Sequence, residues 1–145
     1  MATMKTDGLD EVFRAVTSVG EDTGRLTDDM LLAAAEVVRE EWRRSAGEHG
    51  HRYTGSMIES IGYARKPTKV SDVKSIAIYP QGKDKRGTRN AEKAYILHHG
   101  TKSKRGDKGI KGSGWVDEAE EAAGPKVERT MLEIYEKYLS EKGVY

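Results

Sequence analysis

The sequence contains no cysteine, which excludes disulfide bonds, thiolate metal sites and cysteine nucleophiles. Aromatic residues are scarce, at 7% of the chain with a single Phe. No apolar run approaches the roughly 20 residues that a membrane-spanning helix needs, and the N-terminus lacks the apolar region of a signal peptide. We therefore expect a soluble protein that is made in the cytoplasm and has no membrane partner.

Charged residues, in contrast, are abundant and unevenly distributed. They make up 34% of the chain, yet the formal net charge is only +1. Residues 1–50 carry 6 basic and 11 acidic side chains, residues 51–114 carry 15 and 5, and residues 115–145 carry 4 and 8. Acidic ends around a basic middle favour self-assembly, in which a basic loop meets a neighbour's acidic helix, and also suit phosphate binding. A monomer whose loop folds back onto its own helices would explain the same pattern.

The length of 145 residues predicts one domain over 1–145. Helical periodicity is weak over Leu9–Val19 and plain from Thr27, a good N-cap, to about Ser45. A last helix begins near Asp117 and is interrupted or kinked at Pro125. Between the long helices we expect a short helix at Ser56–Ile61 capped by Thr54, strands at Tyr63–Lys66 and Val73–Tyr79, and a short helix at Ala91–His99.

This order predicts an α+β fold: a small antiparallel sheet packed against a long helix, with a C-terminal helix and long basic loops at about 81–90 and 101–114. In the second strand, alternation predicts that Ile76 and Ile78 face one way and that Ala77 and Tyr79 face the other. The apolar positions that recur across these elements give the predicted core: Leu31, Val38, Trp42, Ile76, Ile78, Met131, Ile134 and Tyr138.

The residues that could carry chemistry do not form a recognisable site. Adjacent residues of a helix point about 100° apart, so His98 and His99 cannot easily share a metal ion. The glycines between Gly106 and Gly114 lack the preceding strand and the following Lys-Ser/Thr of a phosphate-binding loop. We therefore expect no catalytic, cofactor-binding or metal-binding residues, and a histidine at a helix end is expected to be structural.

Three segments, in this order along the chain, resemble one family. Tyr53–Ile61, which reads Tyr-Thr-Gly-Ser-Met-Ile-Glu-Ser-Ile, resembles the "Thr-Gly-x-Leu-x-x-Ser-Ile" segment of tailed-phage neck proteins. Tyr95–Thr101 resembles their "Tyr-x-x-x-x-Glu-x-Gly-Thr" region in compressed form, with histidine in place of the acidic residue. Trp115–Ala119 resembles their "Pro-Phe-Leu-x-Pro-Ala" segment, without its prolines. The family is the tail-completion or head–tail joining proteins of long-tailed phages (siphophages) and related prophages.

The resemblance implies a small α+β structural protein without an active site. It implies a virion location at the head–tail junction, where a ring of identical subunits, a hexamer or a dodecamer, bridges the head-connector and tail-tube proteins. Packaged DNA is a candidate contact. The residues expected to bind partners are the basic side chains of the two loops and the aromatic residue that follows them: Lys83, Lys85, Arg86, Arg89, Lys102, Lys104, Arg105, Lys108, Lys111 and Trp115.

Two other classes of function compete with this one. Residues 82–114 carry ten basic and three acidic side chains, which suits a nucleic-acid-binding accessory protein, although Tyr95 is the only aromatic residue there on which a base could stack. The second competitor is a small toxin-like enzyme with His98 or His99 as its base.

Overall fold

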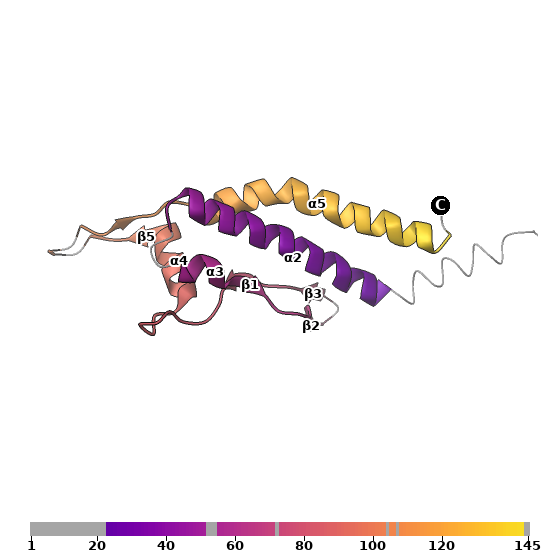
Figure 1. Ribbon diagram of the computed structural model, residues 1–145, viewed down its shortest axis with the longest axis horizontal. Helices are drawn as coiled ribbons and strands as arrows, with labels where there is room; N and C mark the ends of the chain where they lie inside the picture. Colours follow the sequence, from indigo (N-terminus) through magenta and orange to yellow (C-terminus); the bar gives the residue numbers. More distant parts are fainter. Residues whose placement is uncertain (1–22, 52–54, 72, 104, 107, 144–145) are drawn as a thin grey trace, which may run out of the picture.

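A computed structural model of the chain describes residues 23–51, 55–71, 73–103, 105–106 and 108–143. Its body is a pair of long antiparallel helices, α2 (Thr23–Glu48) and α5 (Trp115–Glu141), which lie side by side (Figure 1). Both helices bury alanines, namely Ala34, Ala35 and Ala46 in α2 and Ala119 and Ala123 in α5. Small side chains at these positions let the helix backbones approach closely.

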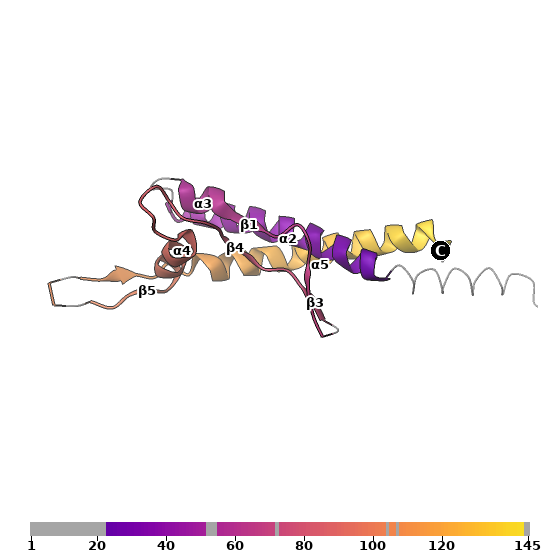
Figure 2. The ribbon, with the colours of Figure 1, turned by 90° about the horizontal axis from the view of Figure 1, so that it is seen from below.

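The remaining elements gather along one side and at one end of the helix pair (Figures 1 and 2). They are α3 (Ser56–Ser60), β1 (Ile61–Tyr63), β2 (Thr68–Val70), β3 (Val73–Ser75), β4 (Ile78–Pro80), α4 (Asn90–His99), β5 (Gly100–Thr101) and β6 (Ile110–Lys111). The strands form three antiparallel pairs, β1 with β4, β2 with β3 and β5 with β6. Long helices with small antiparallel ladders are the α+β class that the sequence predicts, so that prediction is confirmed.

The predicted strand Val73–Tyr79 is two strands with different partners. β3 pairs with β2, in the register Val70↔Val73, whereas β4 pairs with β1, in the register Ile61↔Pro80. The backbone changes partner at Ile76–Ala77, which belongs to neither strand. The predicted alternation is nevertheless present, because Ile76 and Ile78 are half-buried while their neighbours Ala77 and Tyr79 are exposed. The first strand lies a few residues earlier than predicted, and the segment between the two predicted strands contains a further strand, β2.

Two helix boundaries also differ from the sequence prediction. Thr27 lies inside α2, where its hydroxyl donates a hydrogen bond to the Thr23 carbonyl at 2.8 Å instead of capping the helix. Pro125 lies within one continuous helix, so it neither ends α5 nor restarts it. The short helices near Ser56 and Ala91 are confirmed, as is the end of α4 at Gly100. The predicted helix Leu9–Val19 falls outside the described residues, and so does Thr54, the predicted cap of the short helix near Ser56.

The core lies where α3, β1 and α4 meet the junction of the two long helices. Its buried cluster consists of Ala46, Met57, Ile58, Ile61, Ala94 and Trp115, with Trp42, Ile78, Leu97 and Val116 packed against it. The predicted core is wrong in detail, because all eight of its members are only half-buried. Two packed helices form too thin a layer to enclose large side chains, so alanines occupy the contact and the larger apolar residues lie at its edges.

Candidate assembly interface

A basic hairpin, Gly100–Lys111, leaves the end of α4 and returns toward the start of α5; we call it the arm. Figures 1 and 2 both show it extending away from the end of the helix pair rather than lying along it. At its root β5 pairs with β6, in the register Gly100↔Lys111 and Thr101↔Ile110. The Ile110 amide also donates to the Thr101 hydroxyl at 2.8 Å. The arm is therefore held at its base and projects beyond the body.

Glycines make this root possible. A Cβ atom at Gly100 would lie 2.3 Å from the Ile110 carbonyl oxygen, and one at Gly109 would lie 2.5 Å from the Thr101 carbonyl oxygen. A Cβ at Gly112 would lie 2.5 Å from the His98 carbonyl oxygen. In each case the obstacle is backbone, which cannot move aside as a side chain can. The glycine-rich composition of this segment thus lets the two legs of the arm cross the end of α4 closely.

The cations of the arm have no acidic partner among the residues that the structure describes. Lys102, Arg105, Lys108 and Lys111 are exposed, and the ion pairs of the described chain involve none of them. The structure does not describe Lys104. A loop folded back onto its own acidic helices would pair these cations, so the described arm does not support that interpretation. These four cations remain exposed to solvent.

Trp115 does not belong to this exposed surface, although the sequence placed it among the partner-binding residues. It is fully buried, with 0% of its surface exposed. Its ring meets Trp42 edge to face at 5.5 Å, and its indole NH donates to the Ala94 carbonyl at 3.4 Å. The Ser45 hydroxyl donates to the Trp115 carbonyl at 2.6 Å. Trp115 is therefore the core residue that fixes the point where the arm returns to the body, and a partner cannot reach its side chain.

The second basic segment, Gln81–Arg89, is organised by Asp84, and we call it the Asp84 loop. The Asp84 carboxylate accepts hydrogen bonds from the backbone amides of Arg86 and Thr88, each at 2.9 Å, and forms an ion pair with Lys93 of α4. The Lys93 ammonium, followed by these amides, holds the pKa of Asp84 below its ordinary value. The loop therefore has a defined shape that is tied to α4.

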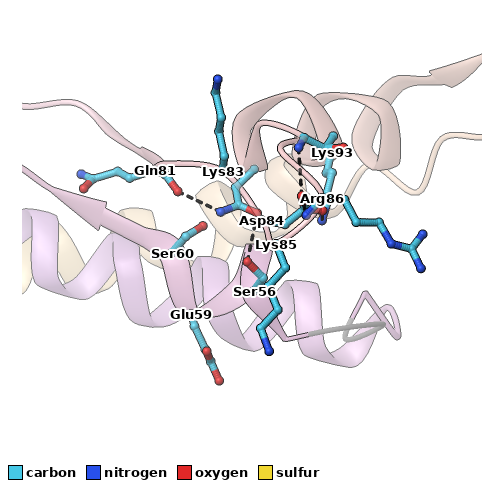
Figure 3. Close-up of a pocket in the computed structure, with 11 residues that line it drawn as sticks. Ser56, Glu59, Ser60, Gln81, Lys83, Asp84, Lys85, Arg86 and Lys93 are labelled. Carbon is cyan, nitrogen blue, oxygen red and sulfur yellow. Dashed lines mark hydrogen bonds and ion pairs between the residues drawn. The ribbon is translucent and has the colours of Figure 1, made fainter.

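An open groove of about 910 Å³ lies between α3 and the Asp84 loop. Figure 3 shows Lys83, Lys85 and Arg86 around it, with their side chains pointing in different directions rather than converging on one point. Divergent cations do not make a site for one small anion. Together with exposed Arg89, they make a broad basic surface suited to an extended partner.

The two histidine pairs lie far apart in the sequence, yet both contact the start of α5. His51 Nε2 lies 2.9 Å from the Ser113 hydroxyl, and His49 Nε2 lies 2.6 Å from a Glu118 carboxylate oxygen. His98 Nδ1 accepts a hydrogen bond from the Val116 amide at 3.3 Å. The fourth histidine, His99, packs against the Tyr95 ring at 4.3 Å. Nothing in the sequence spacing signals this convergence, which only the folded chain creates.

Three of these contacts tie His49, His51 and His98 to the segment in which the arm returns to α5. Burial, and then the nearby His49, lower the pKa of His51, which favours its neutral form beside Ser113. Nowhere in the described ranges do three or more His, Asp or Glu side chains gather as metal ligands would. Within the same ranges, no helix is long and apolar enough to cross a membrane.

Of the predicted partner-binding residues that it describes, the structure brings the cations onto two projections, the arm and the Asp84 loop, at the same end of the molecule, while it buries Trp115 in the core. Comparison with known proteins adds nothing further, since no family model, curated protein or solved structure matches the chain.

Proposed function

We propose that this protein is a structural subunit of the neck of a long-tailed phage. As a tail-completion or head–tail joining protein, it would form a ring, a hexamer or a dodecamer, between the head connector and the tail tube, with no catalytic role. The observation that carries the proposal is the arm, whose exposed cations project from a rigid body without acidic partners in the described part of the subunit. A contact with another molecule explains such a projection.

The arrangement of the three family-like segments also supports this proposal. Met57, Ile58 and Ile61 come from the first segment, Leu97 from the second and Trp115 and Val116 from the third, and all of them pack in or against one buried cluster. The resemblance therefore rests on residues that build a single part of the molecule. That part is the one from which the arm projects.

The shape of the subunit suits a ring. A projection that contacts a different surface on an identical neighbour makes a heterologous interface, which repeats around the assembly and closes into a ring when the rotation allows. Individual ion pairs at an exposed rim contribute only about 0–1 kcal/mol each. Repeated around a ring, they fix register and choice of partner more than affinity.

Deletion of the gene from its phage or prophage tests the proposal. We expect lysates that contain DNA-filled heads and separate tails, and joined particles should return when the protein is supplied in trans. Electron microscopy of the lysates distinguishes the outcomes. If the deletion leaves joined, infectious particles at the usual number, the protein is not required at the head–tail junction and the proposal fails.

Nucleic-acid binding remains the second candidate function because of one observation on α4. The Tyr95 side chain is 65% exposed and lies against the His99 ring beside the arm, which provides an aromatic surface on which a base can stack. Binding to nonspecific duplex DNA, measured over a range of salt concentrations, tests this function. It predicts an affinity that falls steeply with salt and weakens further in Tyr95→Ala.

A further inference from the structure

The acidic residues that lack partners are concentrated on α5. On α2, Asp28 pairs with Lys74, Glu36 and Glu40 with Arg39 and Glu48 with Arg44, while buried Glu41 binds both Arg44 and Lys126. Among the described acids of α2, Asp29 alone forms no ion pair. On α5, five glutamates pair with no described residue: Glu120, Glu121, Glu128, Glu133 and Glu136. Of the two acidic helices, α5 therefore carries most of the charges that remain available to a second molecule.

The outward side of α5 arranges two of these charges, Glu121 and Glu128, in a line with Asp117, whose carboxylate lies 3.8 Å from His98 Nε2. Asp117, Glu121, Glu128, Leu132 and Tyr135 follow one another at spacings that are sums of three and four residues, so they share one face of the helix. All five are exposed, and the two apolar members are 53% and 40% exposed respectively. We call this face the α5 stripe: acidic along its first half and apolar along its second.

The chemistry of the arm is complementary to the stripe. The arm presents four described cations and one large apolar residue, Ile110, which is 49% exposed. The acidic half of the stripe, from Asp117 to Glu128, spans roughly 16 Å at the rise of a helix, which is long enough to meet more than one of these cations.

The arm does not reach the stripe of its own subunit. It projects from the end of the body at which α5 begins, and α5 then runs the opposite way along the helix pair (Figures 1 and 2). The backbone contacts at Gly100 and Gly112 fix this direction at the root of the arm. A contact between the arm and an α5 stripe therefore requires two molecules.

We propose that the arm of one subunit docks on the α5 stripe of a second copy of the same chain. This inference rests on the proposed ring and names the surface that joins its neighbours. The arm cations lie along Asp117, Glu121 and Glu128, and Ile110 covers apolar surface next to them. The contact is heterologous, because the arm and the stripe occupy different parts of each subunit, and it leaves the acids of α2 out of the interface.

Engineered disulfides test this contact directly, because the natural chain has no cysteine. One full-length chain carries Arg105→Cys and a second carries Glu121→Cys; the matched control replaces the second with Glu40→Cys, an exposed position on α2. After mixing at low ionic strength and mild oxidation, we expect about tenfold more mixed covalent dimer with Glu121→Cys than with Glu40→Cys, because a disulfide needs Cα atoms within about 7 Å. Equal yields, or no mixed dimer, overturn the proposal.

Charge exchange provides a second test that does not depend on oxidation. Lys102→Glu with Arg105→Glu on the arm, or Glu121→Lys with Glu128→Lys on α5, should each abolish assembly, whereas all four changes in one chain should restore it. Native mass spectrometry measures the number of subunits in the assembly, and circular dichroism shows whether each variant is folded. If the α5 changes have no effect on assembly, and the arm changes reduce binding to duplex DNA, the arm contacts nucleic acid and the proposal is wrong. A ring of normal size in every variant also overturns it, yet leaves the proposed neck function standing.

Discussion

Trp115 shows how one residue links the arm to the core. It directly follows the glycine-rich return of the arm, yet its ring is fully buried against Trp42 and the ends of α2 and α4. We predict that Trp115→Ala lowers the free energy of unfolding by about 3–5 kcal/mol, because the change leaves a large cavity in a buried cluster. Urea denaturation followed by circular dichroism measures this loss.

Trp42→Ala is the matched control, since Trp42 is half-buried and its indole nitrogen has no hydrogen-bond partner among the described residues. Its cost should be clearly smaller than that of Trp115→Ala. If Trp115→Ala costs less than Trp42→Ala, the core is centred elsewhere.

Glu41 is a buried charge that joins the two long helices. Its carboxylate is 5% exposed and binds Lys126 of α5 and Arg44 of its own helix. The hydrogen bond from Lys126, and then that from Arg44, lower the pKa of Glu41 from its ordinary 4.5. The ionised Glu41 carboxylate therefore stabilises the folded state fully above pH 4.5, and this contribution is lost as the pH falls through the lower pKa that Glu41 has in the folded state.

From this sign we predict that Glu41→Gln costs about 1–2 kcal/mol at pH 7, the range for a hydrogen bond to a charged group whose partners stay partly solvated. The difference from the wild type should shrink at pH 3. Chemical denaturation at both pH values provides the measurement, and a cost that is equal at pH 7 and pH 3 would show that ionisation of Glu41 does not hold the helices together.

Among the elements, the arm depends most on its glycines. In Gly112→Ala the new Cβ would meet the His98 carbonyl oxygen at 2.5 Å, so we predict that the root of the arm opens while the helix pair stays folded. Hydrogen–deuterium exchange should show faster exchange over residues 100–113 and unchanged exchange in α2.

Gly124→Ala is the control, because nothing lies within 4 Å of the added Cβ and alanine is favoured over glycine in a helix by about 1 kcal/mol. This variant should be more stable than the wild type.

Unchanged hydrogen exchange in the arm of the Gly112→Ala variant would mean that the close backbone approach at the root of the arm is not required.

The sequence predicts the α+β class and most elements, because helical and strand periodicities are local signals. The long helices, the end of α2 near Gly47 and the short helix before Gly100 all follow from such signals. The core residues do not, since periodicity identifies the apolar face of a helix but not how thick a layer will cover it. The thickness of the covering layer explains why Ala35 is fully buried while Leu31 is only half-buried.

The candidate site was predictable to a similar extent. Its basic residues follow from composition alone, but the burial of Trp115 and the ion pairs of Asp28 with Lys74 and of Glu41 with Lys126 depend on contacts between distant segments. No local sequence pattern predicts the hydrogen bond from the Ser45 hydroxyl to the Trp115 carbonyl or the ion pair between Glu41 and Lys126.

At the scale of the whole molecule, charge and shape together favour assembly. One end carries the arm and the Asp84 loop, with exposed cations, while α5 carries exposed acids without partners among the described residues. If the arm docks on the α5 stripe of a second copy, as we propose, the contact joins different surfaces of the two subunits, and such contacts close into rings when the rotation allows.

Limited trypsin digestion distinguishes an arm that is a contact between subunits from one that stays in solvent. Trypsin cleaves after the exposed Lys102, Arg105, Lys108 and Lys111. We predict that free subunits are cut first within the arm and that the same bonds resist cleavage in the assembled ring or particle, as mass spectrometry of the fragments would show. Equal rates of cleavage in the free and the assembled protein would contradict this prediction, because the arm would then remain in solvent after assembly.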